Sequence, residues 1–324
     1  MRQAAAAYWA VILATLGGCA VNPPLDLSDI DPPGPRAVLL DVPFHPQQEN
    51  QCGPAALATV LAAAGVDTSP ERLSPGLYLP AREGSLQIEL QGATRREGRI
   101  PYLLNPDPRS LLTEVATGRP VLVLQNLRTP SLPAWHYAVL VGFDVERNEL
   151  RLNSGPDAGL AMAAPRFLRT WDWGGRWAMI ALRPGELPAA PDSARYLSAV
   201  ADFESVAGSK AALPAWQAAA ERWPGDPGPA LAMGNAAYGR GELTEAARYF
   251  RAGLALDPAH PVLANNLASL LGEAGCPRAG ESILQPVAAT LGGDSAWRPA
   301  LQETLAELAA QPGRDPDRCA GFPP

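Results

Sequence analysis

The sequence predicts an α+β domain followed by an all-α domain of helical repeats. In the first half of the chain, helix-forming segments precede a series of short apolar runs that are typical of an antiparallel sheet. The second half is rich in alanine and lacks such runs between residues 193 and 310. The chain has 324 residues, which suffices for two domains.

The first residues have the pattern of an export signal. Arg2 precedes an apolar stretch, residues 4–16, that is too short to span a bilayer and is followed by small residues before Cys19. This arrangement resembles the lipobox of bacterial lipoproteins, which implies a lipid anchor on the Cys19 thiol. Because Ala20 rather than aspartate follows, the resemblance also implies an outer-membrane location in the cell envelope, facing the periplasm. An ordinary signal peptide with an incidental cysteine is the alternative.

Composition shifts divide the chain into six segments. The predicted segments are a signal peptide (1–18), a lipidated cysteine with a proline-rich spacer (19–36), the α+β domain (37–183), a proline-rich linker (184–192), the helical repeats (193–310) and a C-terminal tail (311–324).

Short sequence signals place the elements of the first domain. Helices are expected at 52–65, 85–98 and 108–117, because Pro54 fits a first helical turn and glycines close the segments. Strands are expected at 38–42, 120–125, 136–143, 149–153 and 176–182. Cys52 is therefore predicted at the beginning of a helix.

The second domain contains an internal repeat with a period of 34 residues. Two sets of positions align at this period: Ala212, Ala246 and Gly280, and Trp216, Phe250 and Leu284. The best copy, 227–260, resembles a tetratricopeptide repeat through Gly234, Ala246, Phe250 and Pro258, although Ala237 and Gly253 depart from the pattern. The resemblance implies a concave surface that holds a peptide or partner protein. An unrelated alanine-rich helical bundle is the alternative.

Several functional classes are excluded by composition and motifs. The net charge is -7 and no basic cluster is present, which argues against a nucleic-acid partner. Three histidines without a zinc-protease motif or paired-cysteine knuckle predict no metal site. The absence of a phosphate loop and of a dinucleotide fingerprint leaves no cofactor implied.

The four cysteines have different settings. Cys276 and Cys319 both lie in the helical region and could form a disulfide in an oxidising periplasm. Cys52 is left unpaired, so it is either buried and inert or reactive. Its position at a helix N-terminus, where free N–H groups and the helix dipole stabilise a thiolate, predicts a lowered pKa and a reactive thiol.

A reactive thiolate requires a histidine that accepts and returns its proton. His136 begins an apolar strand run that would aim its side chain rigidly. His45 lies in the loop before Cys52, and His260 is discounted because it lies among the repeats. A purely structural histidine is the alternative for His136.

Three motifs together resemble the bacteriocin-leader-processing (double-glycine) cysteine peptidases, a papain-like family. They are VPF at 42–44 with Gln47, CGPAA at 52–56 and HYAV at 136–139, and the match spans residues 38–183. The resemblance implies a papain-like domain, with helices packed on an antiparallel sheet. It also implies Cys52 as the nucleophile and His136 as the base.

Two further roles are carried over from the family. Gln47 would donate to the oxyanion, with Gln48 as the alternative and Gln51 less suited. Asn153 would orient the imidazole, although Ser154, Asp157 and Asp144 lie close in sequence, and a surface asparagine is the alternative. Four tryptophans either line a substrate cleft or pack in the core: Trp135, Trp171, Trp173 and Trp177.

These features predict a membrane-anchored cysteine peptidase that cleaves peptide or amide bonds and recruits a protein or peptide through its repeats. No exporter is fused to the chain, so leader processing is not implied. The alternatives are a non-catalytic papain-like binding or scaffold lipoprotein, and thiol chemistry on another amide or in acyl transfer.

Overall fold

The computed structural model describes residues 26–39, 41–46, 51–79 and 84–312, together with Cys319 and Phe322. The predicted signal peptide, Cys19, Gln47 and Gln48 lie outside the described residues. Among the helices that are described, none combines the length and the apolar character needed to cross a bilayer.

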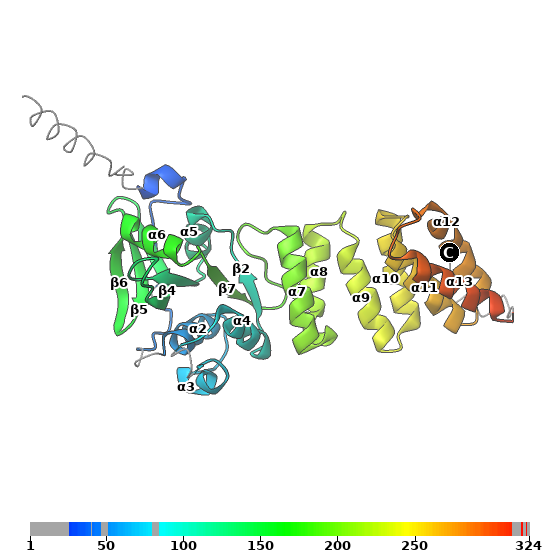
Figure 1. The fold of residues 1–324 in the computed structure, drawn as a ribbon, viewed down its shortest axis with the longest axis horizontal. Coiled ribbons are helices and arrows are strands. Elements are labelled where there is room, and N and C mark those ends of the chain that lie inside the picture. Colours follow the sequence, from blue (N-terminus) through cyan, green and yellow to red (C-terminus); the bar gives the residue numbers. More distant parts are fainter. Residues whose placement is uncertain are drawn as a thin grey trace, which may run out of the picture.

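An antiparallel sheet forms the centre of the first half of the chain (Figure 1). Its strands are β1 (Arg36–Val38), β2 (Ile100–Leu103), β3 (Val121–Asn126), β4 (Trp135–Asp144), β5 (Glu149–Ser154), β6 (Asp157–Ala163) and β7 (Ala178–Leu182). They lie in the order β2-β7-β3-β4-β5-β6, and β1 pairs with the far end of β4. Every pairing is antiparallel, as the sequence predicts.

Helices cover both faces of this sheet. The helical segments of this half are η1 (Leu27–Ile30), α2 (Cys52–Ala63), α3 (Pro70–Leu73), η2 (Ser74–Gly76), α4 (Gln87–Arg96), α5 (Pro108–Ala116) and α6 (Ala164–Trp173). Along β4, Tyr137 and Val139 pack in the core with α2, whereas Ala138 and Leu140 pack in the core with α5 and α6. All of β3 is buried, because both of its faces are covered.

The α+β prediction is confirmed, but β2, β6 and α6 were not predicted. β2 is only four residues long and contains a proline, and β6 is largely exposed, so neither shows a clear strand pattern. β2 lies in the chain between α4 and α5 and pairs with β7. The expectation that the strands from residue 120 onward follow the three helices without another strand between them is therefore wrong, since a long-range pairing creates β2.

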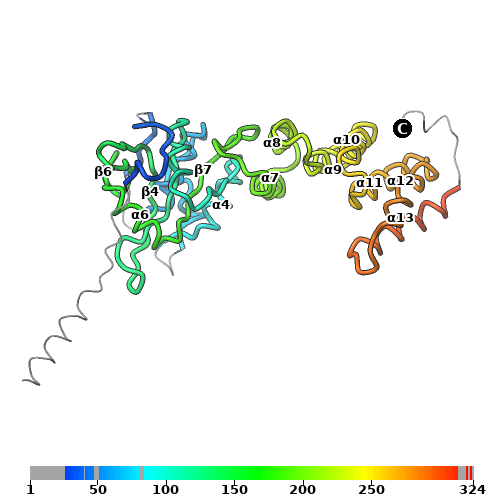
Figure 2. The backbone as a smooth tube through the Cα atoms, turned by 90° about the horizontal axis from the view of Figure 1, so that it is seen from above, coloured from blue at the N-terminus to red at the C-terminus, as the bar shows by residue number. Residues whose placement is uncertain are grey.

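Seven helices follow the sheet in the described chain. They are α7 (Ser193–Ala207), α8 (Ser209–Arg222), α9 (Gly228–Gly239), α10 (Leu243–Leu256), α11 (Pro261–Glu273), α12 (Pro277–Thr290) and α13 (Arg298–Ala310). Figure 2 shows them as a row that leads away from the sheet. The apolar core of β2, β3 and β7 continues into α7 and α8 through Phe203 and Trp216. An ion pair of 2.7 Å between Arg95 of α4 and Asp202 of α7 joins the same two parts. The first helices thus share a core with the sheet.

The best sequence repeat corresponds to the hairpin of α9 and α10. Gly234 of α9 lies against the ring of Phe250 in α10, and a Cβ atom at position 234 would come within 2.3 Å of that ring. Glycine is therefore required where the two helices approach most closely.

A disulfide joins Cys276, at the start of α12, to Cys319 in the tail, with Cα atoms 5.8 Å apart. The guanidinium of Arg251 donates to the Phe322 carbonyl at 3.2 Å, and Phe322 packs in the same apolar cluster as the disulfide. The tail is therefore held against α10 to α12.

Replacing Cys319 with serine is expected to destabilise the helical half. The disulfide closes a loop with a sequence separation of 43, for which chain entropy gives about 4 kcal/mol. Urea unfolding followed by far-UV circular dichroism measures this loss. Cys52→Ser is the control, because it leaves the disulfide intact. An unchanged midpoint in Cys319→Ser would show that the tail does not stabilise the helices.

Candidate active site

Cys52 occupies the first position of α2, as the sequence predicts. It is the free cysteine of the described chain. The side chain of Gln51 does not cap the helix, and the backbone groups of Cys52 and Gly53 hydrogen-bond to the thiol instead. The exposed N–H groups of a helix N-terminus therefore point at the sulfur.

The glycine that follows the cysteine is required by a close approach. A Cβ atom at Gly53 would lie 2.5 Å from the hydroxyl oxygen of Ser85, in the segment that precedes α4. The carbonyl of Ser85 accepts a hydrogen bond of 3.3 Å from the Tyr137 hydroxyl. The Ser85 segment thus packs over the beginning of α2 and against β4.

Cys52 lies against the strand that carries His136, because α2 packs on β4. The Cys52 sulfur accepts a hydrogen bond from the backbone at Tyr137, the residue that directly follows His136. His136 itself is half-buried at the beginning of β4. The packing of a helix on a strand therefore brings Cys52 to the strand on which His136 lies, 84 positions further along the sequence.

The imidazole of His136 is held by Ser154. Its Nε2 atom lies 2.8 Å from the Ser154 hydroxyl oxygen. Asn153, the residue predicted to orient His136, instead accepts a hydrogen bond of 3.0 Å from the backbone N–H of Gly159. Neighbouring residues of a strand point to opposite faces, so only one of the two can face His136. The predicted hydrogen bond to Asn153 is thus made to Ser154.

The other acidic alternatives for this role lie elsewhere. Asp144 accepts a hydrogen bond of 3.0 Å from the backbone N–H of Arg147 and lies 3.8 Å from Arg36, at the far end of β4 from His136. Asp157 is exposed at the beginning of β6. No local sequence signal distinguishes Ser154 from its neighbour Asn153 as the residue that orients His136.

The pKa shifts favour an uncharged cysteine and an uncharged histidine. Burial raises the pKa of the Cys52 thiol, although hydrogen bonds from the backbone of Tyr137, Gly53 and Cys52 act in the opposite direction. Burial lowers the pKa of His136. The lowered Cys52 pKa that the sequence predicts is therefore wrong, because loss of solvent outweighs the helix N-terminus.

The alkylation rate of Cys52 tests this shift. Only the thiolate reacts with iodoacetamide, so a raised pKa should make labelling at pH 7 slower in the folded than in the urea-unfolded protein. The folded profile should also rise at a higher pH. Mass spectrometry of the peptide that contains Cys52 measures both rates. Faster labelling of the folded protein at pH 7 would show a stabilised thiolate instead.

Apolar side chains border the site. Leu127, Leu132 and Trp135 are 45%, 71% and 57% exposed in the β3–β4 hairpin beside His136. The ring of Trp177 packs edge-on against Tyr137 at 5.9 Å. Trp171 is fully buried and Trp173 stacks with Arg169, so the cleft interpretation applies at most to Trp135 and Trp177.

The remaining histidines have other positions. The Nδ1 atom of His260 accepts a hydrogen bond of 3.3 Å from the backbone N–H of Leu263 and caps α11. His45 lies near Glu71, whose carboxyl pKa is lowered chiefly by a hydrogen bond with the Ser69 side chain and to a smaller extent by His45. His136 is therefore the histidine that belongs to the strand on which the Cys52 helix packs.

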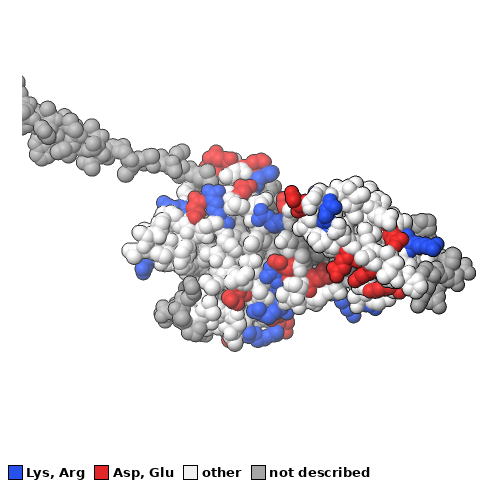
Figure 3. Space-filling view, turned by 45° about the vertical axis from the view of Figure 1, so that its right-hand side comes forward, with Lys and Arg blue, Asp and Glu red and all other residues white. Residues whose placement is uncertain are grey.

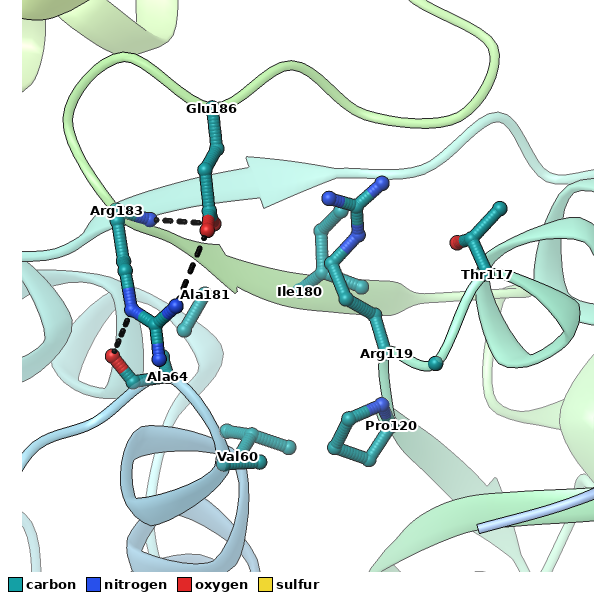
Figure 4. A pocket seen from close by; sticks show the side chains of 11 residues that line it. Val60, Ala64, Thr117, Arg119, Pro120, Ile180, Ala181, Arg183 and Glu186 are labelled. Atoms are coloured by element: carbon teal, nitrogen blue, oxygen red, sulfur yellow. Dashed lines mark hydrogen bonds and ion pairs between the residues drawn. The ribbon is translucent and has the colours of Figure 1, made fainter.

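A small pocket lies at the opposite end of α2 (Figure 4). Its volume is about 200 Å³, and Arg183 on its wall donates from Nε to the Ala64 carbonyl at 2.9 Å. Arg99 donates to the same carbonyl at 2.9 Å. These two guanidinium groups satisfy a backbone carbonyl at the C-terminal end of α2. This structural role explains why the two arginines lie there.

A larger cavity of about 460 Å³ lies on the Asn153 face of β4 and β5. Apolar side chains line it together with two arginines and an asparagine: Arg36, Val38, Leu39, Val42, Phe44, Val141, Arg151, Asn153, Ala158 and Gly159. The described part of the chain contains no cluster of three metal-binding side chains. On the face drawn in Figure 3, basic side chains are scattered among acidic ones.

Residues 39–156 match the family model described as Peptidase_C39 like family, which supports a papain-like peptidase domain in this part of the chain. No curated protein matches the chain.

Two solved structures are similar to the same half. One, described as a C39-like peptidase from Bacillus anthracis, has 16% identity and a TM-score of 0.39, covering 45% of this chain and 97% of that chain. The other is described as a double glycine motif protease from an AMS/PCAT transporter in complex with the leader peptide. It has 22% identity and a TM-score of 0.33, covering 45% of this chain and 96% of that chain.

Proposed function

We propose that residues 37–183 form a cysteine peptidase in which Cys52 attacks the carbonyl of a peptide or amide bond and His136 moves the proton. The observation that carries the proposal is the hydrogen bond to the Cys52 sulfur from the backbone of Tyr137, the residue that directly follows His136. The match of residues 39–156 to a peptidase family supports the same chemistry.

The reaction proceeds through a thioester. As the sulfur–carbon bond forms, the Cys52 proton passes to His136, which then protonates the leaving amine as the carbon–nitrogen bond breaks. Water hydrolyses the thioester and regenerates the thiol. The backbone N–H of Cys52, at the start of α2, and the side chain of Gln47 are the proposed donors to the oxyanion.

Location and recruitment complete the proposal. Lipid attachment at Cys19 would hold the enzyme at the periplasmic face of the outer membrane. The helices between residues 193 and 310 would act as tetratricopeptide-like repeats that bring a protein or peptide substrate to the site. Leu127, Leu132 and Trp135 provide an exposed apolar surface for that substrate beside His136.

A cleavage assay tests the peptidase. The purified chain is incubated with a mixture of unstructured peptides, and new termini are identified by mass spectrometry. We expect cleavage by the native chain and none by Cys52→Ala, with Cys276 and Cys319 left intact in both. Equal cleavage by the Cys52→Ala variant would contradict the proposal.

One observation favours a second function, a binding protein that holds peptides without cleaving them. The raised pKa of Cys52 leaves less thiolate at neutral pH. In that case the assay yields no new termini, while a peptide from the same mixture binds both the native chain and Cys52→Ala with equal affinity.

A further inference from the structure

The hydroxyl of Ser154 is the polar group that faces Nε2 of His136, at 2.8 Å. Ser154 is the last residue of β5, whose register places Asn153 opposite Val139 of β4. Val139 belongs to the α2 face of the sheet, so Asn153 and Ser154 point to different faces. Ser154 therefore faces His136 because of strand geometry.

The described side chains that hydrogen bonding and strand pairing place at His136 are neutral. Gln125 lies directly opposite on β3, and paired residues of neighbouring strands share a face. Gln125 is fully buried, and its Nε2 donates to the Thr170 hydroxyl of α6 at 2.6 Å. The thiol of Cys52 lies beside the backbone of Tyr137, and the phenol of Tyr137 lies on the α2 face.

Burial lowers the pKa of His136, and no charged side chain in the described chain contributes to this shift. A carboxylate at the position of Ser154 would stabilise an imidazolium, whereas a hydroxyl adds no charge. The hydrogen bond still fixes the ring. When Nε2–H donates to Ser154, the other ring nitrogen, Nδ1, is left unprotonated as a base.

We propose that Ser154 is the positioning residue of His136, and that this neutral partner makes the site rest as a thiol and an imidazole rather than as an ion pair. The inference rests on the peptidase proposed above. The Cys52 proton then moves to Nδ1 of His136 only as the sulfur–carbon bond forms. Ser154 holds the ring throughout and exchanges no proton with the substrate.

Three variants separate charge, size and position. Ser154→Asp adds a carboxylate beside Nε2. Ser154→Asn introduces a side chain of nearly the same size as aspartate but without its charge, and Asn153→Asp puts the same charge on the opposite face of β5. The pH profile of iodoacetamide labelling at Cys52 is measured for each in the full chain, by mass spectrometry. Circular dichroism establishes that each variant is folded.

Ser154→Asp is expected to move the labelling profile toward acid by about one pH unit or more, because an imidazolium beside Cys52 stabilises the thiolate. Ser154→Asn should produce no acid shift, and Asn153→Asp a smaller one. The proposal is overturned if folded Ser154→Asp labels like Ser154→Asn, or if Asn153→Asp shifts the profile as far as Ser154→Asp.

Kinetics supply a second readout. Ser154→Ala should lower kcat for peptide cleavage about 10-fold with KM unchanged, and Ser154→Thr, which keeps the hydroxyl, should restore most of the loss. Equal kcat values for Ser154→Ala and the native chain would contradict a positioning role. If no peptide is cleaved, the proposed peptidase fails, while the labelling profiles still decide how Ser154 and His136 are coupled.

Discussion

Replacing His136 with alanine is expected to lower kcat/KM for peptide cleavage by about 10²–10⁴-fold, the usual contribution of a general base. The effect should be large because burial raises the pKa of Cys52, so the thiol depends on a neighbouring base to lose its proton. Initial rates with the best peptide from the cleavage assay measure the loss.

His260→Ala is the control for this variant. It removes the N-cap of α11, which costs about 1 kcal/mol of stability, but it leaves the site beside Cys52 unchanged. Its kcat/KM should therefore equal that of the native chain. A similar loss in both variants would mean that cleavage reports on folding rather than on proton transfer by His136.

Replacing Phe203 with alanine is expected to destabilise the sheet and the first helices together by about 3–5 kcal/mol. Phe203 is fully buried on α7, in the core that also contains Ile100 and Leu182 of the sheet. Urea unfolding is followed by two signals: far-UV circular dichroism, and the labelling of Cys52, which reports on the sheet domain. Both midpoints should fall.

Val206→Ala on the same helix is the matched control, because Val206 is 51% exposed and its truncation should change stability by less than about 0.5 kcal/mol. If Phe203→Ala weakens the helical signal while Cys52 keeps its native protection against labelling, the sheet and the helices are separate units and the shared core contributes little.

Much of the site follows from local sequence signals. Pro54 in the first turn and the small residues after it begin a helix at Cys52, and the structure starts α2 at that residue. The apolar run after His136 forms β4. The short β2 and the exposed β6 escaped prediction, since their pairing with β7 and β5 rather than their own pattern makes them strands.

The sequence by itself determined the candidates for the chemistry: a cysteine at the beginning of a helix and a histidine at the beginning of a strand, because capping and periodicity act over a few residues. Only the tertiary structure decided that Ser154 rather than Asn153 meets His136, since a strand's register sets which side chain faces which way. It also decided the direction of the Cys52 pKa, because burial depends on the packing of α2 on β4.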